Sequence, residues 1–419
     1  MYKKLAKLIL CLIVTSSVLY SGGFQLNEHG ARSMSQGGAF AARANDPSAI
    51  YFNPAGLAHL DGTRLMLGAT VIFPNIAFTP HYSNPFANNT EEIDAESLVF
   101  TPINLYFTHQ LNDMFTVGLG VFNPYGLGTE WNSDWIGRAL SVKAEIQLFN
   151  FNPTVAAKFF NDKLSVAAGF NFVMGSVEML REAVSAPPAP DPVTLHLKAG
   201  LTDGTGYGYN FGIQYKPTPS LNFGFSYRSA VDVKVEGDAT FTPPSLIDVL
   251  GLPEGKVKST LNLPANIFIG AACSPIDNLW LEFNAQFIGW SAFDKLELYF
   301  QQLPLGENGV LTLEKHYKDT WILRLGAEYT LSDALALSCG IFRDLNPVPD
   351  ETLDPMLPDS DRWGINLGVS YRINKMLSFD LAYMFLPFDE RTTKVQKDRF
   401  YGTYNTSTNL FGFNVNFNF

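Results

Sequence analysis

The last ten residues of the chain, LFGFNVNFNF, alternate strictly between large apolar side chains and small or polar ones. One parity carries four phenylalanines and a valine, and the other carries glycine and asparagine: Phe411, Phe413, Val415, Phe417 and Phe419 against Gly412, Asn414, Asn416 and Asn418. In an extended strand, successive side chains point to opposite faces. A strand of a soluble sandwich can show this pattern. A strand with lipid on one face and a wet interior on the other fits it equally well.

The first residues have the pattern of an export signal. The stretch MYKKLAKLILCLIVTSSVLYS places three lysines before an apolar run and small residues after it, as secretory signal peptides do. A membrane anchor helix is the alternative, but the apolar run is short for a span. We therefore expect a signal peptide over residues 1–21, cleaved near Ser21–Gly23.

Composition narrows the class of protein. The formal net charge is −11, and it becomes −14 once the three lysines of the acid-free signal are removed. An acidic exported chain is a poor binder of nucleic acid. The chain has 3 cysteines, too few for a disulfide scaffold. Aromatic residues make up 14% of the chain, glycine occurs 34 times, and no second long apolar run predicts a helical span. This composition is typical of a membrane β-barrel.

Segments of alternating hydrophobicity recur along the chain and predict strands. We place them at residues 64–73, 98–110, 115–123, 142–160, 164–180, 205–216, 220–236, 257–274, 278–300, 317–330, 334–343, 362–373, 377–386 and 408–419. Short connections rich in Asn, Asp and Pro alternate with long ones, and those residue types favour turns. This sorting predicts an all-β fold, a 14-stranded antiparallel transmembrane barrel with short periplasmic turns and long external loops.

Residues 22–63 lack the alternation. The stretch from Asn27 to Ala42 predicts one or two small helices, and Asn53-Pro54-Ala55 predicts a turn. A segment of about forty residues cannot bury a core by itself. It is therefore either a periplasmic tail or a plug inside the barrel, since a barrel of this width needs filling unless it is an open pore.

At this point the sequence resembles a known family. The stretch GFQLNEHGAR, followed by FNPAGLA, resembles the amino-terminal hatch of FadL-type long-chain fatty acid transporters. Collinear matches such as NPYGLGTEW, YKDTWILRLG and DSDRWG extend the resemblance along nearly the whole chain. The resemblance implies a helical hatch over residues 22–63 that plugs a barrel over residues 64–419.

The resemblance also implies a function in the bacterial outer membrane. It implies passive uptake of long-chain fatty acids or similar hydrophobic compounds through an internal apolar pocket, a hatch rearrangement and sideways exit at a kink in the third strand. Uptake of aromatic or aliphatic hydrocarbons by the same route is an alternative, and a surface structural protein or adhesin anchored by its barrel is another. We expect no enzyme activity, no cofactor and no metal. The expected partners are the ligand, outer-membrane lipid and lipopolysaccharide, and the expected state is a monomer.

Two groups of candidate residues follow from the hatch and the third strand. Hatch or gating roles fall on Phe24, Asn27, Asn53, Pro54 and Ala55, although the NPA turn is at least as easily structural. In the third strand, Gly118 and Gly120 take the interior parity and Pro124 removes a ladder hydrogen bond. We expect the lateral opening at Gly118, Gly120, Phe122, Pro124 and Gly126, with an ordinary strand end as the alternative.

Charges are placed by the same alternation. Lys318 and Arg362 take the interior parity at strand starts that follow long loops, so they are candidates for the carboxylate of a fatty acid. The alternative is an internal salt bridge to Asp344, Asp361 or Glu328, because a buried cation needs a partner. In the loop at 239–256, a short apolar helix with Leu246, Val249 and Leu250 is a candidate for external capture of the ligand.

Overall fold

The computed structural model describes residues 22–183, 193–242, 255–301, 309–393 and 399–419, so the predicted signal peptide lies outside the described residues. Strands dominate: β1 (Thr63–Pro80), β2 (Ile93–Asp94), β3 (Ile103–Gln110), β4 (Phe115–Phe122), β5 (Gly126–Glu130), β6 (Lys143–Phe159), β7 (Leu164–Ala183), β8 (Val193–Thr218), β9 (Leu221–Arg228), β10 (Val231–Thr242), β11 (Gly255–Leu263), β12 (Asn266–Ile276), β13 (Leu279–Ile288), β14 (Lys295–Phe300), β15 (Val310–Glu314), β16 (Thr320–Ser332), β17 (Leu335–Asp344), β18 (Arg362–Arg372), β19 (Leu377–Pro387), β20 (Arg391–Thr392) and β21 (Gly402–Asn418). The helices are α2 (Ala31–Ser35), α3 (Ala49–Phe52), η1 (Pro54–His59) and η3 (Trp290–Ala292). None of these described helices is long and apolar enough to cross a membrane.

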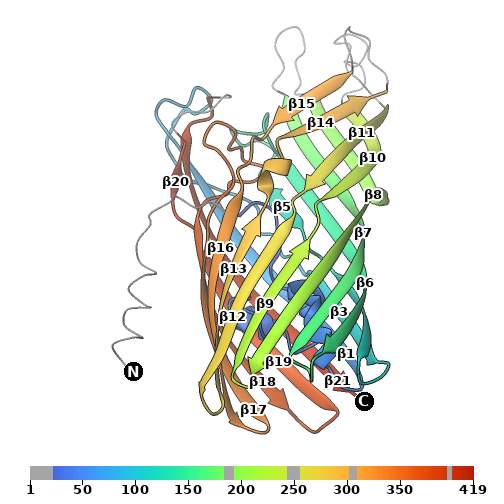
Figure 1. Ribbon diagram of the computed structural model, residues 1–419. Coiled ribbons are helices and arrows are strands. Elements are labelled where there is room, and N and C mark those ends of the chain that lie inside the picture. The colour runs from blue at the N-terminus through green and yellow to red at the C-terminus, as the bar shows by residue number, and fades with distance from the viewer. Residues whose placement is uncertain (1–21, 184–192, 243–254, 302–308, 394–398) are drawn as a thin grey trace.

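The strands form one closed antiparallel barrel (Figure 1). Its 14 wall positions follow chain order, and five of them are built from two consecutive elements: β4 with β5, β9 with β10, β11 with β12, β13 with β14, and β15 with β16. The first and last strands close the ring, in a register that runs from Arg64 opposite Asn418 to Pro80 opposite Gly402. The predicted 14-stranded barrel is confirmed.

The C-terminal strand shows how the alternation maps onto the two faces. Phe411 and Phe413 on β21 are 51% and 43% exposed. Asn414, which has the opposite parity on the same strand, is fully buried. Asn414 donates to the side chain of Asn104 on β3 and accepts from the backbone of Ala31. The apolar parity therefore faces lipid, and the small polar parity faces the contents of the barrel.

Several strands reach further outward than the sequence predicts. β1 runs to Pro80 rather than to residue 73, β8 begins at Val193 rather than at 205, and β21 begins at Gly402 rather than at 408. These outer ends project beyond the apolar band into water, where one face no longer has to be apolar. The alternation that marks a membrane strand is therefore lost before the strand itself ends.

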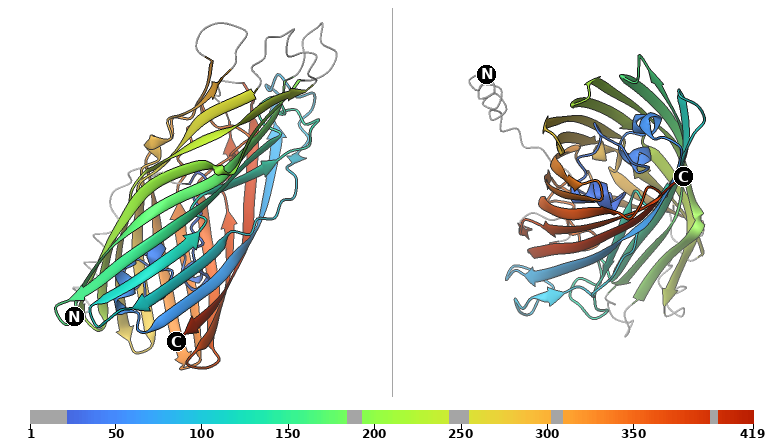
Figure 2. Two further views of the ribbon diagram at one scale, coloured as in Figure 1. Left: turned by 90° about the vertical axis from the view of Figure 1, so that its right-hand side faces the viewer. Right: turned by 90° about the horizontal axis from the view of Figure 1, so that it is seen from below.

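Residues 22–62, here called the plug segment, lie inside the barrel (Figure 2, right, blue coils). Helix α2 packs against β17, β18, β19 and β21, and η1 packs against β4, β6, β7 and β8. Most of its side chains are buried, among them Phe40, Ile50 and Phe52. The plug segment has no independent core and is buried by the inner wall of the barrel.

Charged groups fix the body of the plug segment to one side of the wall. Glu328 on β16 accepts hydrogen bonds from Nε and Nη2 of Arg32, both at 2.7 Å, and from Nη1 of Arg43 at 3.1 Å. Glu282 on β13 accepts from the backbone of Ala42 at 2.7 Å and from Nε of Arg43 at 3.3 Å. Because these groups are almost fully buried, removal of one partner would leave an uncompensated charge.

Candidate functional site

The third strand of the wall is interrupted at residues 123–125, here called the wall break. β4 pairs with β3 as far as Phe122, and the chain resumes as β5 at Gly126, which pairs with β6. Pro124 has no N–H to continue the ladder. The side chain of Asn123 bridges the break, accepting from the Ile103 N–H at 2.9 Å and donating to the Leu148 carbonyl at 2.7 Å. The third strand is therefore interrupted at the place where the sequence analysis expects a kink.

The start of the plug segment pairs with this break. The Leu26 N–H donates to the Pro124 carbonyl, and the Gly126 N–H donates to the Phe24 carbonyl, both at 3.0 Å. Gln25 and Tyr125 form an isolated antiparallel bridge between these two bonds. The chain from Gly22 to Leu26, here called the tail, thus acts as a short edge strand at the break.

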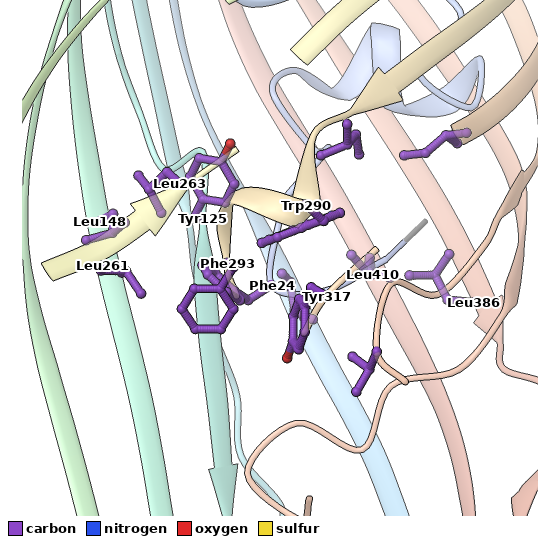
Figure 3. Packing of buried hydrophobic residues seen from close by; sticks show 14 of the residues in the cluster. Phe24, Tyr125, Leu148, Leu261, Leu263, Trp290, Phe293, Tyr317, Leu386 and Leu410 are labelled. Atoms are coloured by element: carbon purple, nitrogen blue, oxygen red, sulfur yellow. The ribbon is translucent and has the colours of Figure 1, made fainter. Parts of the chain in front are cut away.

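Phe24 sits at the centre of an aromatic cluster (Figure 3). Its side chain is 3% exposed, and its ring lies 4.9 Å from Trp290, 5.4 Å from Phe293 and 5.8 Å from Tyr125, measured between ring centroids. Edge-to-face contacts of this kind add about 0.5–1.5 kcal/mol each beyond the area they bury. The ring is held by packing alone.

Two cavities meet at Phe24. The first, here called the apolar cavity, spans about 850 Å³ of space that is partly open to solvent, and it is lined by strands β6 to β8, β10, β11 and β14. The second, here called the gap cavity, spans about 1320 Å³, also partly open to solvent, and it is lined by the tail, the wall break and the outer half of β1. Phe24, Leu127, Glu145, Ile146 and Leu357 line both cavities. A compound that moves between them has to pass these five side chains.

The apolar cavity has a small set of charged groups along its wall. Most of its lining is aliphatic, with Met179, Leu197 and Leu298 on one side. Lys315 is 5% exposed and pairs with Asp354 at 2.6 Å. A side pocket that shares those three apolar residues is lined by Arg181, whose Nη2 lies 3.0 Å from the sulfur of Met356. An apolar chain with a charged end fits this distribution of side chains.

The gap cavity is richer in acids. Glu28, Asp344 and Asp359 line it together with Arg362. Arg362 donates from Nε to Asp344 at 2.8 Å and lies 3.7 Å from Asp359. Burial raises the pKa of Asp359 to about 6, against the lowering effect of Arg362. Asp359 accepts from the Gly23 N–H at 2.6 Å, so the loop between β17 and β18 holds the tail from the outer side.

One sequence-based placement is wrong. The alternation predicts that Lys318 faces the lumen, but the residue is exposed and lines neither cavity. That prediction needs a strand from residue 317, whereas β16 begins at Thr320, so parity says nothing about position 318. Lys198, Lys258 and Lys315 all line the apolar cavity, and Lys315 is the buried one of the three. Arg362 does lie inside, and it has the salt bridge to Asp344 that the alternative interpretation named.

The remaining hatch candidates have contacts that fix the plug segment. Asn53 caps η1 by accepting from the Ala55 N–H at 3.2 Å, and its amide donates to the Ile213 carbonyl on β8 at 3.0 Å. Pro54 occupies the first position of that helix, where a backbone N–H would have no partner within the helix, so its absence costs no hydrogen bond. Asn27 accepts from the guanidinium of Arg324 at 3.0 Å. A gating role for these residues stays a prediction.

The glycines of the third strand make room for the plug segment. A side chain on Gly118 would meet Leu57 at 2.6 Å and Ile50 at 3.0 Å, and one on Gly120 would meet Ile50 at 2.9 Å. Phe122, at the end of β4, is fully buried. Gly118 and Gly120 thus accommodate the plug segment, and the ladder of the third strand is interrupted further along, at residues 123–125. The external candidates Leu246, Val249 and Leu250 lie outside the described residues.

Sequence reasoning missed Lys315, Trp290 and the loop between β17 and β18. No local pattern marks them, because each lies in a loop or in a break between strands. Lys315 and the β17–β18 loop line the cavities, and Trp290 packs against Phe24. Among the described residues, no three His, Cys, Asp or Glu side chains are grouped as a metal site.

Comparisons with known proteins agree with this geometry. The family model described as "Outer membrane protein transport protein (OMPP1/FadL/TodX)" matches residues 12–419. The chain is 27% identical to the "Long-chain fatty acid transport protein" of Escherichia coli O6:H1 over 90% of each chain, and 28% identical to the "47 kDa outer membrane protein" of Pasteurella multocida over 97% of this chain and 96% of that one.

Solved structures show the same fold. A Pseudomonas aeruginosa FadL homologue superposes with a TM-score of 0.81 at 23% identity, covering 96% of this chain and all of the other. The Pseudomonas putida toluene transporter TodX superposes with a TM-score of 0.74 at 18% identity, covering 94% and 99%.

Proposed function

The chain belongs to the OMPP1/FadL/TodX family of outer-membrane transport proteins, and from this premise we propose that it takes up long-chain fatty acids passively. The family members are transporters of hydrophobic compounds and not enzymes, so this chain is an outer-membrane transporter of that kind. The finer assignment of the ligand rests on the two cavities and on the full-length relatives that carry fatty acids.

One observation carries the proposal: Phe24 separates the two cavities with its side chain while its backbone pairs with the wall break. A ligand in the apolar cavity displaces the ring, and that movement strains the hydrogen bonds at Pro124 and Gly126. Detachment of the tail joins the apolar cavity to the gap cavity. The break in the third strand then offers a sideways exit into the membrane, which lets an apolar ligand avoid water.

The energetics favour a long aliphatic ligand. Each methylene transferred from water into an apolar site contributes about 0.8 kcal/mol. The apolar cavity places Lys315 and, through the adjoining side pocket, Arg181 close to aliphatic walls. We assign the carboxylate to these two cations rather than to Lys318, and we assign Arg362 to the later stage in the gap cavity.

The test is a binding competition in lipid-free detergent between a long-chain fatty acid, toluene and an alkane. The informative variant is Lys315→Met with Asp354→Asn, which removes the cation without leaving its acid unpaired. Loss of a charge-assisted hydrogen bond costs about 1.5–3 kcal/mol, so the preference for the fatty acid should fall roughly tenfold or more. Lys318→Ala is the matched control, because Lys318 lines neither cavity, and it should leave the preference unchanged.

Uptake of hydrocarbons is the second candidate. It is favoured by the pairing of the buried cations, since Lys315 already has Asp354 and Arg362 already has Asp344. A ligand without a carboxylate would leave both pairs intact. Equal or tighter binding of toluene or the alkane, insensitive to the double variant, would overturn the fatty acid assignment in favour of this one. The family match favours transport over the adhesin alternative.

A further inference from the structure

Strand β8 contains more residues than either of its neighbours across one stretch of wall. Against β7, Gly204 pairs with Gly175 but Ala199 pairs with Val177, so β8 advances five residues where β7 advances two. Against β10, Gly204 pairs with Val235 but Lys198 pairs with Asp238, so β8 advances six residues where β10 advances three. The excess is three residues on both edges, which locates one insertion in β8 itself.

The neighbouring strands are regular on their far sides. Ser176 on β7 pairs with Gln147 of β6, and Glu236 and Gly237 on β10 pair with Lys258 and Val257 of β11. The ladder is therefore interrupted only where the wall consists of β8. The segment Gly200–Asp203 contains a local hydrogen bond, in which the Gly200 N–H donates to Oδ2 of Asp203 at 2.8 Å.

The insertion projects outward next to the apolar cavity. Residues 200–203 are exposed, and none of them lines the cavity, whereas Ala199 and Gly237 beside them do. A side chain on Gly204 would meet the Gly175 carbonyl at 2.7 Å, so the rim of the interruption has no room for one. Between the apolar cavity and the outside, residues 200–203 of β8 have no register partner on β7 or on β10.

The insertion lies at a level of the membrane where an interrupted strand ladder can be tolerated. Below it on β8, outward-facing Tyr207, Tyr209 and Phe211 are 64%, 57% and 37% exposed, as in the aromatic girdles of membrane barrels. Lys198, above it, is exposed and pairs with Glu178. Unpaired backbone groups are not tolerated in hydrocarbon. At the level of the lipid headgroups they can bind water, and the same water can be displaced.

We propose that the insertion Leu201–Asp203 is a lateral portal through which long apolar compounds dissolved in the outer leaflet reach the apolar cavity. This inference rests on the proposed function. The portal lies on β8 beside the apolar cavity, whereas the wall break lies on the third strand beside the gap cavity. Compounds would thus be admitted at one side of the barrel and leave at another, and Phe24 stands between the two.

A bulge can also serve only to bend a long strand, and deletion of Leu201, Thr202 and Asp203 separates the two roles. That deletion brings β8 into continuous register with β7 and β10 together. The control keeps the length and changes the side chains: Leu201→Ser, Thr202→Ala and Asp203→Ser. Each protein is reconstituted in vesicles, and loading of a fluorescent long-chain fatty acid is timed with the acid supplied either in the bilayer or from water.

The deletion should slow loading from the bilayer about tenfold, with loading from water and equilibrium binding in detergent unchanged. The length-preserving control should load at the wild-type rate from both sources. Unchanged loading from the bilayer in the deletion variant, or equal slowing from both sources, would overturn the portal. Failure of the wild type to bind fatty acid in detergent would refute the proposed function instead, and that measurement does not involve the insertion.

A second measurement does not depend on the deletion variant folding. In a background with Cys273→Ser and Cys339→Ser, a cysteine is placed at Ala199, beside the insertion, or at Ala144, which lines the same cavity from β6. Both alanines are at most 6% exposed. A bilayer-dissolved maleimide should label Ala199→Cys about tenfold faster than Ala144→Cys. Equal labelling rates would overturn the portal.

Discussion

The body of the plug segment and its tail are neighbours in sequence, but they are held by different chemistry. The body is anchored by buried charges: Arg32 and Arg43 share Glu328, and Glu282 accepts from both the side chain and the backbone of Arg43. The tail is held by two backbone hydrogen bonds at the wall break, by the Gly23 bond to Asp359, by a bond from the Gln25 side chain to the Tyr51 hydroxyl and by the packing of the Phe24 ring. No described residue from Gly22 to Leu26 forms an ion pair.

This difference separates a fixed part from a movable one. Breaking a buried ion pair costs about 3–5 kcal/mol, whereas a neutral hydrogen bond contributes about 0.5–1.5 kcal/mol net. A ligand that fills the apolar cavity can therefore supply enough free energy to detach the tail without dislodging the body. In this account the body of the plug stays in place during transport and only the tail moves.

The largest expected effect comes from loosening the body. Glu328→Gln removes the carboxylate that the buried Arg43 and the partly buried Arg32 share. The free energy of unfolding should fall by about 3–5 kcal/mol, measured by denaturant titration. Glu236→Gln is the control, because its pair with Lys258 is half exposed and exposed pairs contribute about 0–1 kcal/mol. Equal effects of the two variants would contradict the anchoring role of Glu328.

A smaller effect is expected where the body packs on the third strand. Gly118→Val would drive a methyl group into Leu57, and overpacking of this kind costs about 1–3 kcal/mol. Leu57→Ala in the same chain should recover part of that loss, because it vacates the contact. Thermal unfolding of both variants measures the effect. A stable Gly118→Val protein with impaired uptake would instead assign the glycine to the lateral opening.

The smallest effect concerns the tail and depends on pH. The pKa of Asp359 is raised to about 6 from the usual 3.8 by burial, so the folded state favours the protonated acid. Its stabilising contribution is complete below the ordinary pKa and is lost as the pH rises through about 6. Lowering the pH from about 7 to about 5 should stabilise the wild type by roughly 1 kcal/mol relative to Asp359→Asn. Parallel unfolding free energies of the two proteins over that range would contradict this assignment.

Much of the barrel could be predicted from the sequence because lipid imposes a period of two on every strand that crosses it. Phe411 and Asn414 lie on the faces that their parity predicts. The same rule fails where lipid is absent. It predicts Lys318 and not Lys315 in the lumen, because residues 315–319 precede β16 and follow no alternation.

The functional details depend on contacts between distant segments. Lys315 is buried because Asp354 reaches it from the loop between β17 and β18. Asp359 of that loop holds Gly23, which lies 336 positions away in the sequence. The insertion in β8 is visible only when the register of both neighbouring strands is known. A single sequence contains none of these pairings, whereas the Gly and Pro residues at the wall break mark it locally.

The most direct test of a fixed body and a movable tail is a pair of disulfide tethers. Gln25→Cys with Tyr125→Cys joins the tail to the wall break at the bridge that pairs them, and opposed residues of antiparallel strands have a spacing that a disulfide can span. Ser35→Cys with Ser338→Cys joins the body to β17, where the two hydroxyl oxygens lie 2.6 Å apart. Fatty acid uptake is then measured before and after reduction. The account predicts that the tail tether abolishes uptake until it is reduced and that the body tether leaves uptake unchanged. Uptake that persists with the tail tethered, or that stops when only the body is tethered, would contradict it.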